Sequence, residues 1–267
     1  QNNQSSAKFY TFKYSKDFPI AISTTRPETK LGDTAVAVHP NDKRYQKYIG
    51  KTYKVDFAGA NLEIKIVADE SVDMEFGTGA LGVTPAHSSI DAEIAKRHNL
   101  PSIQVINEYA KICLPIPGLE GEKTTSAREK IVNWLKQENL LEKVEEVIQN
   151  VSTAERTGGI IEPLPKLQWF VDVNKPIENR GNKSLKELMH DAVASGQIKI
   201  LPERFEKEYF NWINNLRDWN ISRQVWYGHR IPVWYRGNDV CVGIDKPEDT
   251  GWEQDPDTLD TWFSSGL

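Results

Sequence analysis

Hydrophobic and polar positions alternate over residues 8–14, and short apolar runs at 20–23 and 34–38 are typical of buried strands, so the first 90 residues read as strands and turns. The tetrapeptide Ala58-Gly59-Ala60-Asn61 separates two apolar runs and predicts a hairpin turn. A further segment, 76–83, carries three glycines, which is typical of a bulge or of a close approach between backbone and ligand. The predicted strands are 8–14, 20–23, 34–38, 55–57, 62–67 and 76–83.

Helical patterns are fewer and come later. We expect a helix over 89–98, with Ser88 as its N-cap and Asp91 three positions on, and a second over 126–141 capped by Thr125. Two more are expected near 184–195 and 205–216. Because strands and helices do not alternate strictly, a Rossmann domain is disfavoured. The pattern favours an α+β fold, with a β-barrel-like core and helices on its outside.

The character of the sequence changes near residue 150, where Asn150 to Gly159 reads as a loop. We therefore predict two parts. Residues 1–155 form the domain with the barrel-like core. Residues 156–267 form a mixed segment rich in Trp, Arg and His towards its end.

Composition changes this picture little. The chain has 267 residues, 39% of them hydrophobic and 27% charged, with a net charge of −5, as in a globular protein with a real core. No apolar run approaches the roughly 18 residues needed to cross a bilayer, and no membrane partner is expected. The polar start lacks an initiator Met and a signal-peptide pattern, so we expect an interior piece of a longer cytoplasmic chain, monomeric by default. Cys113 and Cys241 have apolar neighbours, and we expect buried, reduced thiols.

General searches for chemistry exclude several classes. The five histidines lie in neither an HExxH nor a GxSxG context, no P-loop occurs, and no metal site is predicted. Two segments, Thr24 to Thr29 and Gly77 to Asp91, concentrate hydroxyls, glycines and a few charges at strand ends, where loops usually hold sites.

These segments also carry a resemblance. TTRPETKLGDTAVAVHP and FGTGALGVTPAHSSIDAEIAKRHNLP resemble the editing insertion of the class I valyl-tRNA synthetases, and less closely that of the isoleucyl and leucyl enzymes. Further on, IIEPLPKLQWFVDV, NWINNLRDWNISRQVWYGHRIPVWY and QDPDTLDTWFSSGL resemble the segments where that family's chain returns to its synthetic domain. The resemblance covers nearly the whole chain.

The resemblance implies a proofreading function. The parent enzyme would join valine to tRNA(Val) with ATP and Mg²⁺ in its synthetic site. This chain lacks both HIGH-type and KMSKS-type sequences, so we expect no aminoacylation and no cofactor here. Its partner would be the 3′ end of tRNA(Val) carrying threonine. Editing is needed because an apolar pocket rejects the threonine hydroxyl by only about a hundredfold, whereas a pocket that hydrogen-bonds the hydroxyl reverses the preference.

The catalytic pair that the resemblance implies is Asp91 and Thr84. Asp91 would hold the α-ammonium group of the substrate and orient the ester against a water molecule, and Thr84 would line the pocket. Phe76 would form an aromatic wall. The alternative readings are a capping-box partner for Asp91, a half-buried strand residue for Thr84 and a core side chain for Phe76.

The terminal adenosine or its phosphate would bind Arg26, with Thr24 and Thr25 donating hydrogen bonds nearby. A surface ion pair is the alternative for Arg26. We interpret Glu28 and Asp33 as carboxylates that order the loop.

Gly79, Gly82, His87 and Ser88 complete the predicted substrate-binding set. His87 either orders its turn or acts as a base. Valyl enzymes commonly carry lysine where Gly82 stands and aspartate where Ser88 stands, so the contact to the threonine hydroxyl stays open. Because no Ser, Cys or His is placed as a nucleophile, we expect direct attack by water.

Two alternatives to an active hydrolase remain. One is a tRNA-docking structural module whose editing is reduced or lost. The other is a free-standing editing factor, disfavoured by the synthetic-domain segments after residue 219. Basic side chains form either part of a tRNA-facing patch or a solvated face; they are Lys43, Arg44, Lys47, Lys96 and Arg97.

Overall fold

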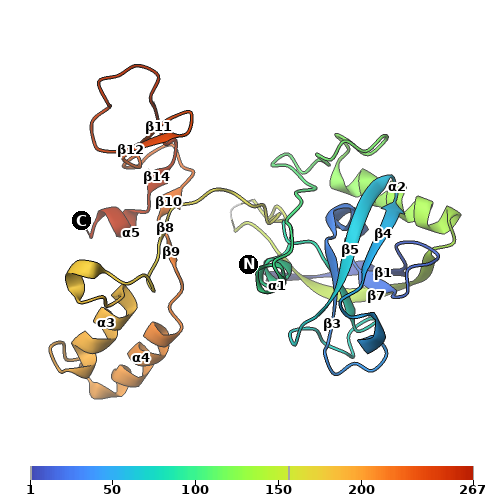
Figure 1. Ribbon diagram of the computed structural model, residues 1–267, viewed down its shortest axis with the longest axis horizontal. Helices are drawn as coiled ribbons and strands as arrows, with labels where there is room; N and C mark the ends of the chain where they lie inside the picture. The colour runs from blue at the N-terminus through green and yellow to red at the C-terminus, as the bar shows by residue number, and fades with distance from the viewer. Residues whose placement is uncertain (1, 156, 267) are drawn as a thin grey trace. The chain divides into compact units, whose positions relative to one another are not determined.

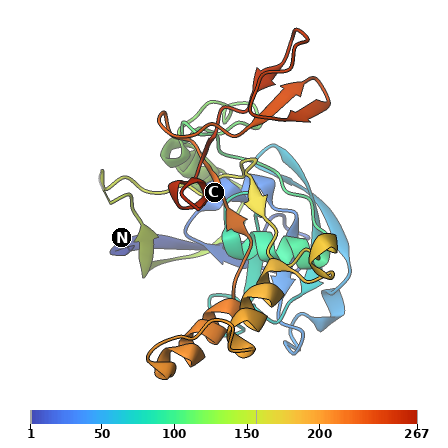
Figure 2. The ribbon, with the colours of Figure 1, turned by 90° about the vertical axis from the view of Figure 1, so that its left-hand side faces the viewer.

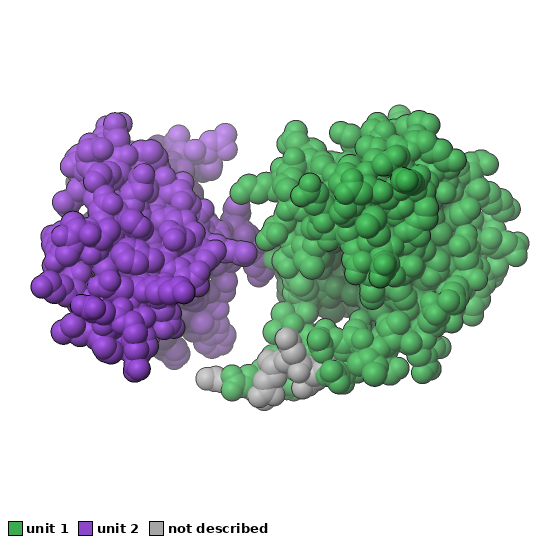
Figure 3. Space-filling model, turned by 90° about the horizontal axis from the view of Figure 1, so that it is seen from below, with its two compact units in different colours: residues 1–165 green, residues 166–267 purple. Residues whose placement is uncertain are grey.

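A computed structural model describes residues 2–155 and 157–266. The chain forms two compact units, residues 1–165 and residues 166–267 (Figure 3). We call them unit 1 and unit 2.

Unit 1 contains two sheets (Figure 1). In the first, the long strand β1 lies between β2 and β7 and is antiparallel to both. In the second, the order is β4-β5-β3-β6; only the β3–β5 pair is parallel. The strands are β1 (Asn2–Phe12), β2 (Ile22–Thr24), β3 (Ala35–Val38), β4 (Thr52–Phe57), β5 (Ala60–Ala68), β6 (Ala80–Val83) and β7 (Leu141–Ser152).

The predicted hairpin is confirmed as β4–β5. Its two turn residues, Ala58 and Gly59, have φ values of 50° and 87°. A turn with two positive φ values matches the twist of the flanking strands. The Asp56 carboxylate accepts a hydrogen bond from the Gly59 N–H at 2.9 Å, so local chemistry fixes the register of this hairpin.

An aromatic cluster forms the centre of the unit 1 core. Phe12 stacks on Phe57 with ring centroids 5.5 Å apart, and Tyr14 meets Phe57 edge-on at 5.4 Å. Phe18 and Trp134 extend the cluster on either side. Such pairs contribute about 0.5–1.5 kcal/mol each beyond burial. Since the Tyr14 ring is fully buried in this packing, the position of its hydroxyl is fixed.

Helix α1 (Ser89–His98) has the predicted bounds. The Ser88 hydroxyl accepts a hydrogen bond from the Asp91 N–H at 3.2 Å, and Asn99 ends the helix in the left-handed conformation with φ 51°. Ile94 packs against a small cluster beneath β3 and β6. The helix therefore begins just after the end of β6.

Helix α2 (Thr124–Gln137) is shorter than predicted. Its N-cap is Lys123 rather than Thr125. The predicted end at residue 141 is wrong, because Asn139 turns the chain with φ 57° and Leu141 begins β7. A buried stripe of Ala127, Ile131 and Leu135 holds the helix on the core. Two short 3₁₀ helices, η1 (Pro27–Gly32) and η2 (Gln46–Tyr48), complete unit 1.

Unit 2 is built from a helix pair and small sheets. Helices α3 (Leu185–Ala194) and α4 (Glu206–Asn214) pack together (Figures 1 and 2). A capping box of Ser184 and Glu187 starts α3. The sheets are β8-β9, β10-β14 and β12-β11-β13. The other elements are η3 (Glu178–Arg180), η4 (Glu203–Phe205), β8 (Phe170–Val171), β9 (Trp219–Asn220), β10 (Ser222–Arg223), β11 (Val233–Arg236), β12 (Asp239–Val242), β13 (Glu253–Gln254), β14 (Thr258–Leu259) and α5 (Thr261–Ser264).

The mixture of strands with few helices is as predicted, but the barrel is not confirmed. Across residues 2–155 and 157–266, the strands form separate sheets of two to four strands with no closed ring. The predicted strand 76–83 shortens to β6, because Gly77 and Gly79 adopt φ values of 61° and 74° and make a turn.

Two further expectations differ from the structure. The units divide after Pro165 rather than after residue 155, since contacts described below hold the segment up to Pro163 against unit 1. Cys113 is exposed and Cys241 partly exposed, and both are free thiols. Their predicted burial is wrong: Ile112 points into the core, and its neighbour Cys113 faces outward.

Candidate functional site

A cluster of buried polar side chains lies where η1 meets the end of β6. The Lys30 ammonium donates to the Gly82 carbonyl at 2.6 Å, to the Thr84 hydroxyl at 2.9 Å and to Asp33 Oδ1 at 3.3 Å. Asp33 also accepts hydrogen bonds from the Thr84 hydroxyl and from the Tyr14 phenol. Lys30, Asp33, Tyr14 and Thr84 are each at most 5% exposed. Every one of these polar groups therefore has its partner inside the protein.

The backbone explains why a lysine is buried here. Pro27 opens η1 and fixes its first turn, and all of η1 is buried. The side chain of Lys30 therefore reaches inward to the carboxylate of Asp33, which follows η1 directly. A buried ammonium is tolerated only when it is paired and hydrogen-bonded, and three acceptors meet that condition.

Burial dominates the acid–base behaviour of the cluster. It raises the pKa of the Asp33 carboxyl, against the opposing effects of the Lys30 charge and of the hydrogen bonds from Thr84 and Tyr14. Burial, followed by the neighbouring Asp33 charge, raises the pKa of the Tyr14 phenol well above its usual value. Tyr14 therefore remains a proton donor to Asp33 at neutral pH.

Gly82 makes room for this arrangement. A Cβ atom at residue 82 would lie 2.5 Å from Asp33 Oδ2, 2.6 Å from the Tyr14 hydroxyl and 2.9 Å from Ile22 Cδ1. The glycine is thus required by the close approach of the protein's own side chains to the strand, whereas the glycine-rich segment predicted a bulge or a close approach to a ligand.

Asp91 connects α1 to the same cluster. Its Oδ2 accepts a hydrogen bond from the Thr84 N–H at 2.8 Å, and its Oδ1 accepts one from the Ser88 hydroxyl at 2.9 Å. The carboxylate is 5% exposed. Asp91 therefore does more than cap its own helix, because it holds the first residue after β6 in place. Each oxygen of a carboxylate can accept a further hydrogen bond.

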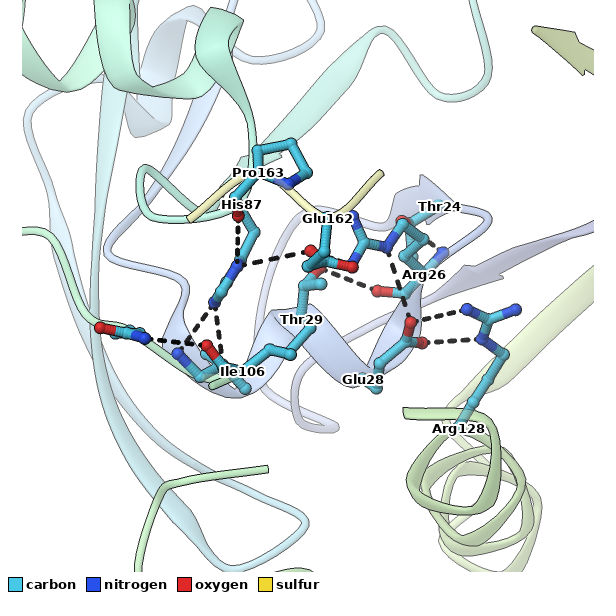
Figure 4. A network of polar contacts seen from close by, with 11 residues as sticks. Thr24, Arg26, Glu28, Thr29, His87, Ile106, Arg128, Glu162 and Pro163 are labelled. Atoms are coloured by element: carbon cyan, nitrogen blue, oxygen red, sulfur yellow. Dashed lines mark hydrogen bonds and ion pairs between the residues drawn. The ribbon is translucent and has the colours of Figure 1, made fainter. Parts of the chain in front are cut away.

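Arg26 lies at the rim of the site and is bound by a segment from the end of unit 1 (Figure 4). Its Nη2 donates to both carboxylate oxygens of Glu162 at 2.7 Å. Its backbone N–H donates to the Thr24 hydroxyl at 3.0 Å. Burial alone would raise the pKa of Glu162, but hydrogen bonds from His87 and Arg26 outweigh it and lower the pKa. The alternative interpretation of Arg26, an ion pair, is therefore present in the structure, and Glu162 is the partner.

His87 holds two separate segments together (Figure 4). Its Nε2 accepts hydrogen bonds from the backbone N–H groups of Val105 and Ile106 at 2.9 and 3.1 Å. Its Nδ1 lies 3.2 Å from the Pro163 carbonyl. A ring nitrogen that accepts two N–H groups carries no proton, so the proton is on Nδ1, which faces both the Pro163 carbonyl and, at 3.5 Å, Glu162 Oε1. With the ring engaged at both nitrogens and 3% exposed, the turn-ordering interpretation of His87 is favoured over the base.

Glu28 performs the ordering role that its position suggests. It is fully buried, and Arg128 of α2 donates to its two oxygens at 2.8 and 2.6 Å (Figure 4). A bidentate pair of this kind adds directional specificity to charge attraction. It ties α2 to η1 and so fixes the loop that carries Arg26 and Lys30.

The remaining predicted residues have other surroundings. Phe76 is 65% exposed and contacts the Phe9 ring at a centroid distance of 5.4 Å. It is therefore a surface side chain, not a core one. Thr25 and Ser88 are partly exposed, and Gly79 is buried. A Cβ at Gly79 would lie 2.6 Å from the Met74 carbonyl.

The basic side chains near the site are partly engaged. Arg44 is paired with Asp42, and Arg97 with Asp69. Lys47 lies over the Tyr48 ring at 4.9 Å.

Within 2–155 and 157–266, no group of three or more His, Cys, Asp or Glu is arranged to hold a metal ion. No helix in the same residues is long and apolar enough to cross a membrane.

Sequence reasoning placed Asp91, Thr84, Ser88 and Gly82 in one set, and the structure brings these together. It missed Lys30, Tyr14 and Glu162. Lys30 sits in a loop motif where a lysine is ordinarily solvated, and Glu162 lies far along the chain, so neither gave a local signal.

A sequence profile described as tRNA synthetases class I (I, L, M and V) matches residues 25–251. The match covers most of the chain, and the chain belongs to this family. Relatives within the family include valine–tRNA ligases. That of Halalkalibacterium halodurans is 46% identical over 265 residues, which cover 97% of this chain and 29% of the relative. That of Geobacillus stearothermophilus is 47% identical over 251 residues, 93% of this chain and 27% of the relative.

The chain thus spans less than a third of the length of these relatives. Among solved structures, a ternary complex of an Agrobacterium radiobacter K84 LeuRS with tRNA covers 99% of this chain and 31% of its own, at 14% identity and a TM-score of 0.35. A likeness at that level carries no argument about the fold.

Proposed function

We propose that unit 1 is the editing site of a valyl-tRNA synthetase and that it hydrolyses the ester of threonyl-tRNA(Val). The observation that carries the proposal is the environment of Asp91. Two hydrogen bonds orient its carboxylate, which keeps further acceptor capacity beside the Thr84 hydroxyl. In the wider protein, the synthetic site that uses ATP and Mg²⁺ to attach valine would lie outside this chain.

The reaction follows from these groups. The substrate ammonium binds the Asp91 carboxylate, which orients the ester carbonyl for attack by water. Water adds its oxygen to the carbonyl carbon and the ester C–O bond breaks. The products are threonine and a tRNA with a free terminal hydroxyl, which takes the proton. Binding of the tRNA end at Arg26 would require its guanidinium to exchange Glu162 for a phosphate, since both anions fit the same planar fork.

The test is threonine release from threonyl-tRNA(Val) by the 267-residue chain. Asp91→Asn removes the charge and keeps the shape, and we expect it to slow release at least a hundredfold. Asp56→Asn is the matched control, because Asp56 is an exposed residue of β4 and the asparagine Oδ1 can still accept the hydrogen bond from the Gly59 N–H; its rate should equal that of the wild type. A wild-type rate no faster than spontaneous hydrolysis would sink the proposal.

A tRNA-docking module is the second candidate. It is favoured by two observations: Arg26 is already paired with a carboxylate, and Thr84 is 1% exposed. In that case the chain would bind tRNA(Val) in a mobility-shift assay and release no threonine. Binding together with release that depends on Asp91 rejects it.

A further inference from the structure

Lys30 is a buried cation in the candidate site for which the reaction described above has no use. Its side chain is 7% exposed and is surrounded by Asp33, Thr84 and the Gly82 carbonyl. Burial of an ammonium costs several kcal/mol unless its partners compensate. A lysine held there needs a reason beyond packing, because an unbranched apolar side chain of similar length would avoid that cost.

All three N–H bonds of the Lys30 ammonium have acceptors, so Lys30 acts through its partners and not on a ligand directly. The partner that matters is the Thr84 hydroxyl. A hydroxyl has one proton and two acceptor lone pairs. The proton is donated to Asp33, and one lone pair accepts from Lys30. What remains is a single lone pair of fixed direction.

Such a hydroxyl can only accept a hydrogen bond from a ligand, and because Thr84 is 1% exposed the ligand has to displace the groups that cover it. A ligand that carries a hydroxyl on its β-carbon can supply the proton, whereas a methyl group in the same place cannot. Without Lys30 the Thr84 hydroxyl keeps two free lone pairs, so its accepting direction is no longer unique, and the Asp33 carboxylate loses the cation that is paired with it. The selectivity of the site then decreases.

The missing side chain at residue 82 is part of the same arrangement. Gly82 supplies the carbonyl at 2.6 Å from Lys30 Nζ and leaves the space that Asp33 and Tyr14 occupy. The ammonium group beside β6 therefore comes from Lys30 of η1 and not from residue 82 of the strand.

We propose that Lys30 is a positioning residue that fixes the Thr84 hydroxyl as an obligate acceptor, and so makes the site select aminoacyl esters with a side-chain hydroxyl over apolar isosteres. This inference rests on the proposed function and specifies how that site reads its substrate.

The test measures affinities of the 267-residue chain for two hydrolysis-resistant amide analogues, threonyl-adenosine and valyl-adenosine, by calorimetry. The wild type should prefer the threonyl analogue. Lys30→Met should lower the ratio of the two affinities at least tenfold. Thr84→Val should do the same, and Lys30→Met should lower the ratio no further in the Thr84→Val background, because the lysine acts through the threonine. Lys54→Met is the matched control, since Lys54 is an exposed residue of β4 with its side chain 85% exposed.

If Lys30 has only a structural role, Lys30→Met should lower the affinities for both analogues equally, or its effect on their ratio should add to that of Thr84→Val. Either result overturns the proposal, as does a wild type without preference. If Lys30→Met does not fold, Thr84→Val carries the test, and an unchanged ratio in that variant overturns the proposal.

Failure of the two proposals can be told apart. Preferential binding of the threonyl analogue without threonine release rejects the hydrolase and leaves Lys30 in its role. Release that depends on Asp91, with a ratio insensitive to Lys30→Met, rejects the role of Lys30 alone.

Discussion

The tight contacts around Gly82 make a sharp prediction about Gly82→Ala. The added methyl group would lie 2.5 Å from Asp33 Oδ2 and 2.6 Å from the Tyr14 hydroxyl. Tyr14 cannot retreat, because its ring is fully buried among Phe12, Phe18 and Phe57. Asp33 cannot retreat without leaving Lys30 and Thr84. The strain must therefore appear as a broken hydrogen bond, a shifted strand, or both.

The size of the effect follows from three contributions. Overpacking a filled core costs about 1–3 kcal/mol. Leaving a buried polar group without its partner costs about 1–3 kcal/mol. Against these, replacing glycine by alanine restricts the unfolded chain and returns up to about 1 kcal/mol. We expect unit 1 to lose about 3 kcal/mol of its free energy of unfolding.

The assay is urea unfolding followed by pulsed hydrogen exchange, with peptides of unit 1 analysed by mass spectrometry. Peptides are needed because most tryptophans lie in unit 2, so total fluorescence would not report on unit 1. Gly159→Ala is the control, since a Cβ there meets only the Thr157 hydroxyl, at 3.4 Å. If Gly82→Ala unfolds within about 0.5 kcal/mol of the wild type, which is the range of neutral surface changes, the reasoning about Gly82 is refuted.

Two further predictions use the same assay. His87→Ala should destabilise unit 1 by about 2 kcal/mol or more, because the Val105 and Ile106 N–H groups lose their acceptor; an unchanged midpoint would show that water replaces the ring at no cost. Asp69→Asn should destabilise unit 1 at pH 7. Burial would raise the pKa of Asp69, but hydrogen bonds from Arg97 and Ser71 prevail and lower it. Its stabilisation is thus complete above the unfolded-state pKa of about 4 and is lost as the pH falls towards the folded-state pKa. The difference in free energy of unfolding between wild type and Asp69→Asn should shrink as the pH falls from about 5 to about 2, the range in which carboxylates titrate. A difference that stays constant over this range would contradict the prediction.

The elements that were predicted well have their causes close together in the sequence. The bounds of α1 follow from the Ser88 cap and from the turn at Asn99, and the β4–β5 hairpin follows from its short turn. The first strand and β7 were predicted poorly for the opposite reason. β1 and β7 are far apart in the sequence, and they pair from Asn2 opposite Ser152 to Phe12 opposite Leu141. Long-range pairing of this kind overrides local propensity.

The amino-acid sequence by itself determined the family, the polar and glycine-rich segments that meet at the site, and the pairing of Ser88 with Asp91 at the start of α1. These depend on residue identity or on neighbours a few positions apart. Only the tertiary structure decided that Lys30 is buried, that Tyr14 reaches Asp33, and that Glu162 occupies Arg26. A charge becomes a buried group when distant segments close over it, and that closure depends on the packing of the whole unit. The buried cation beside β6 accordingly comes from Lys30 of η1 and not from residue 82.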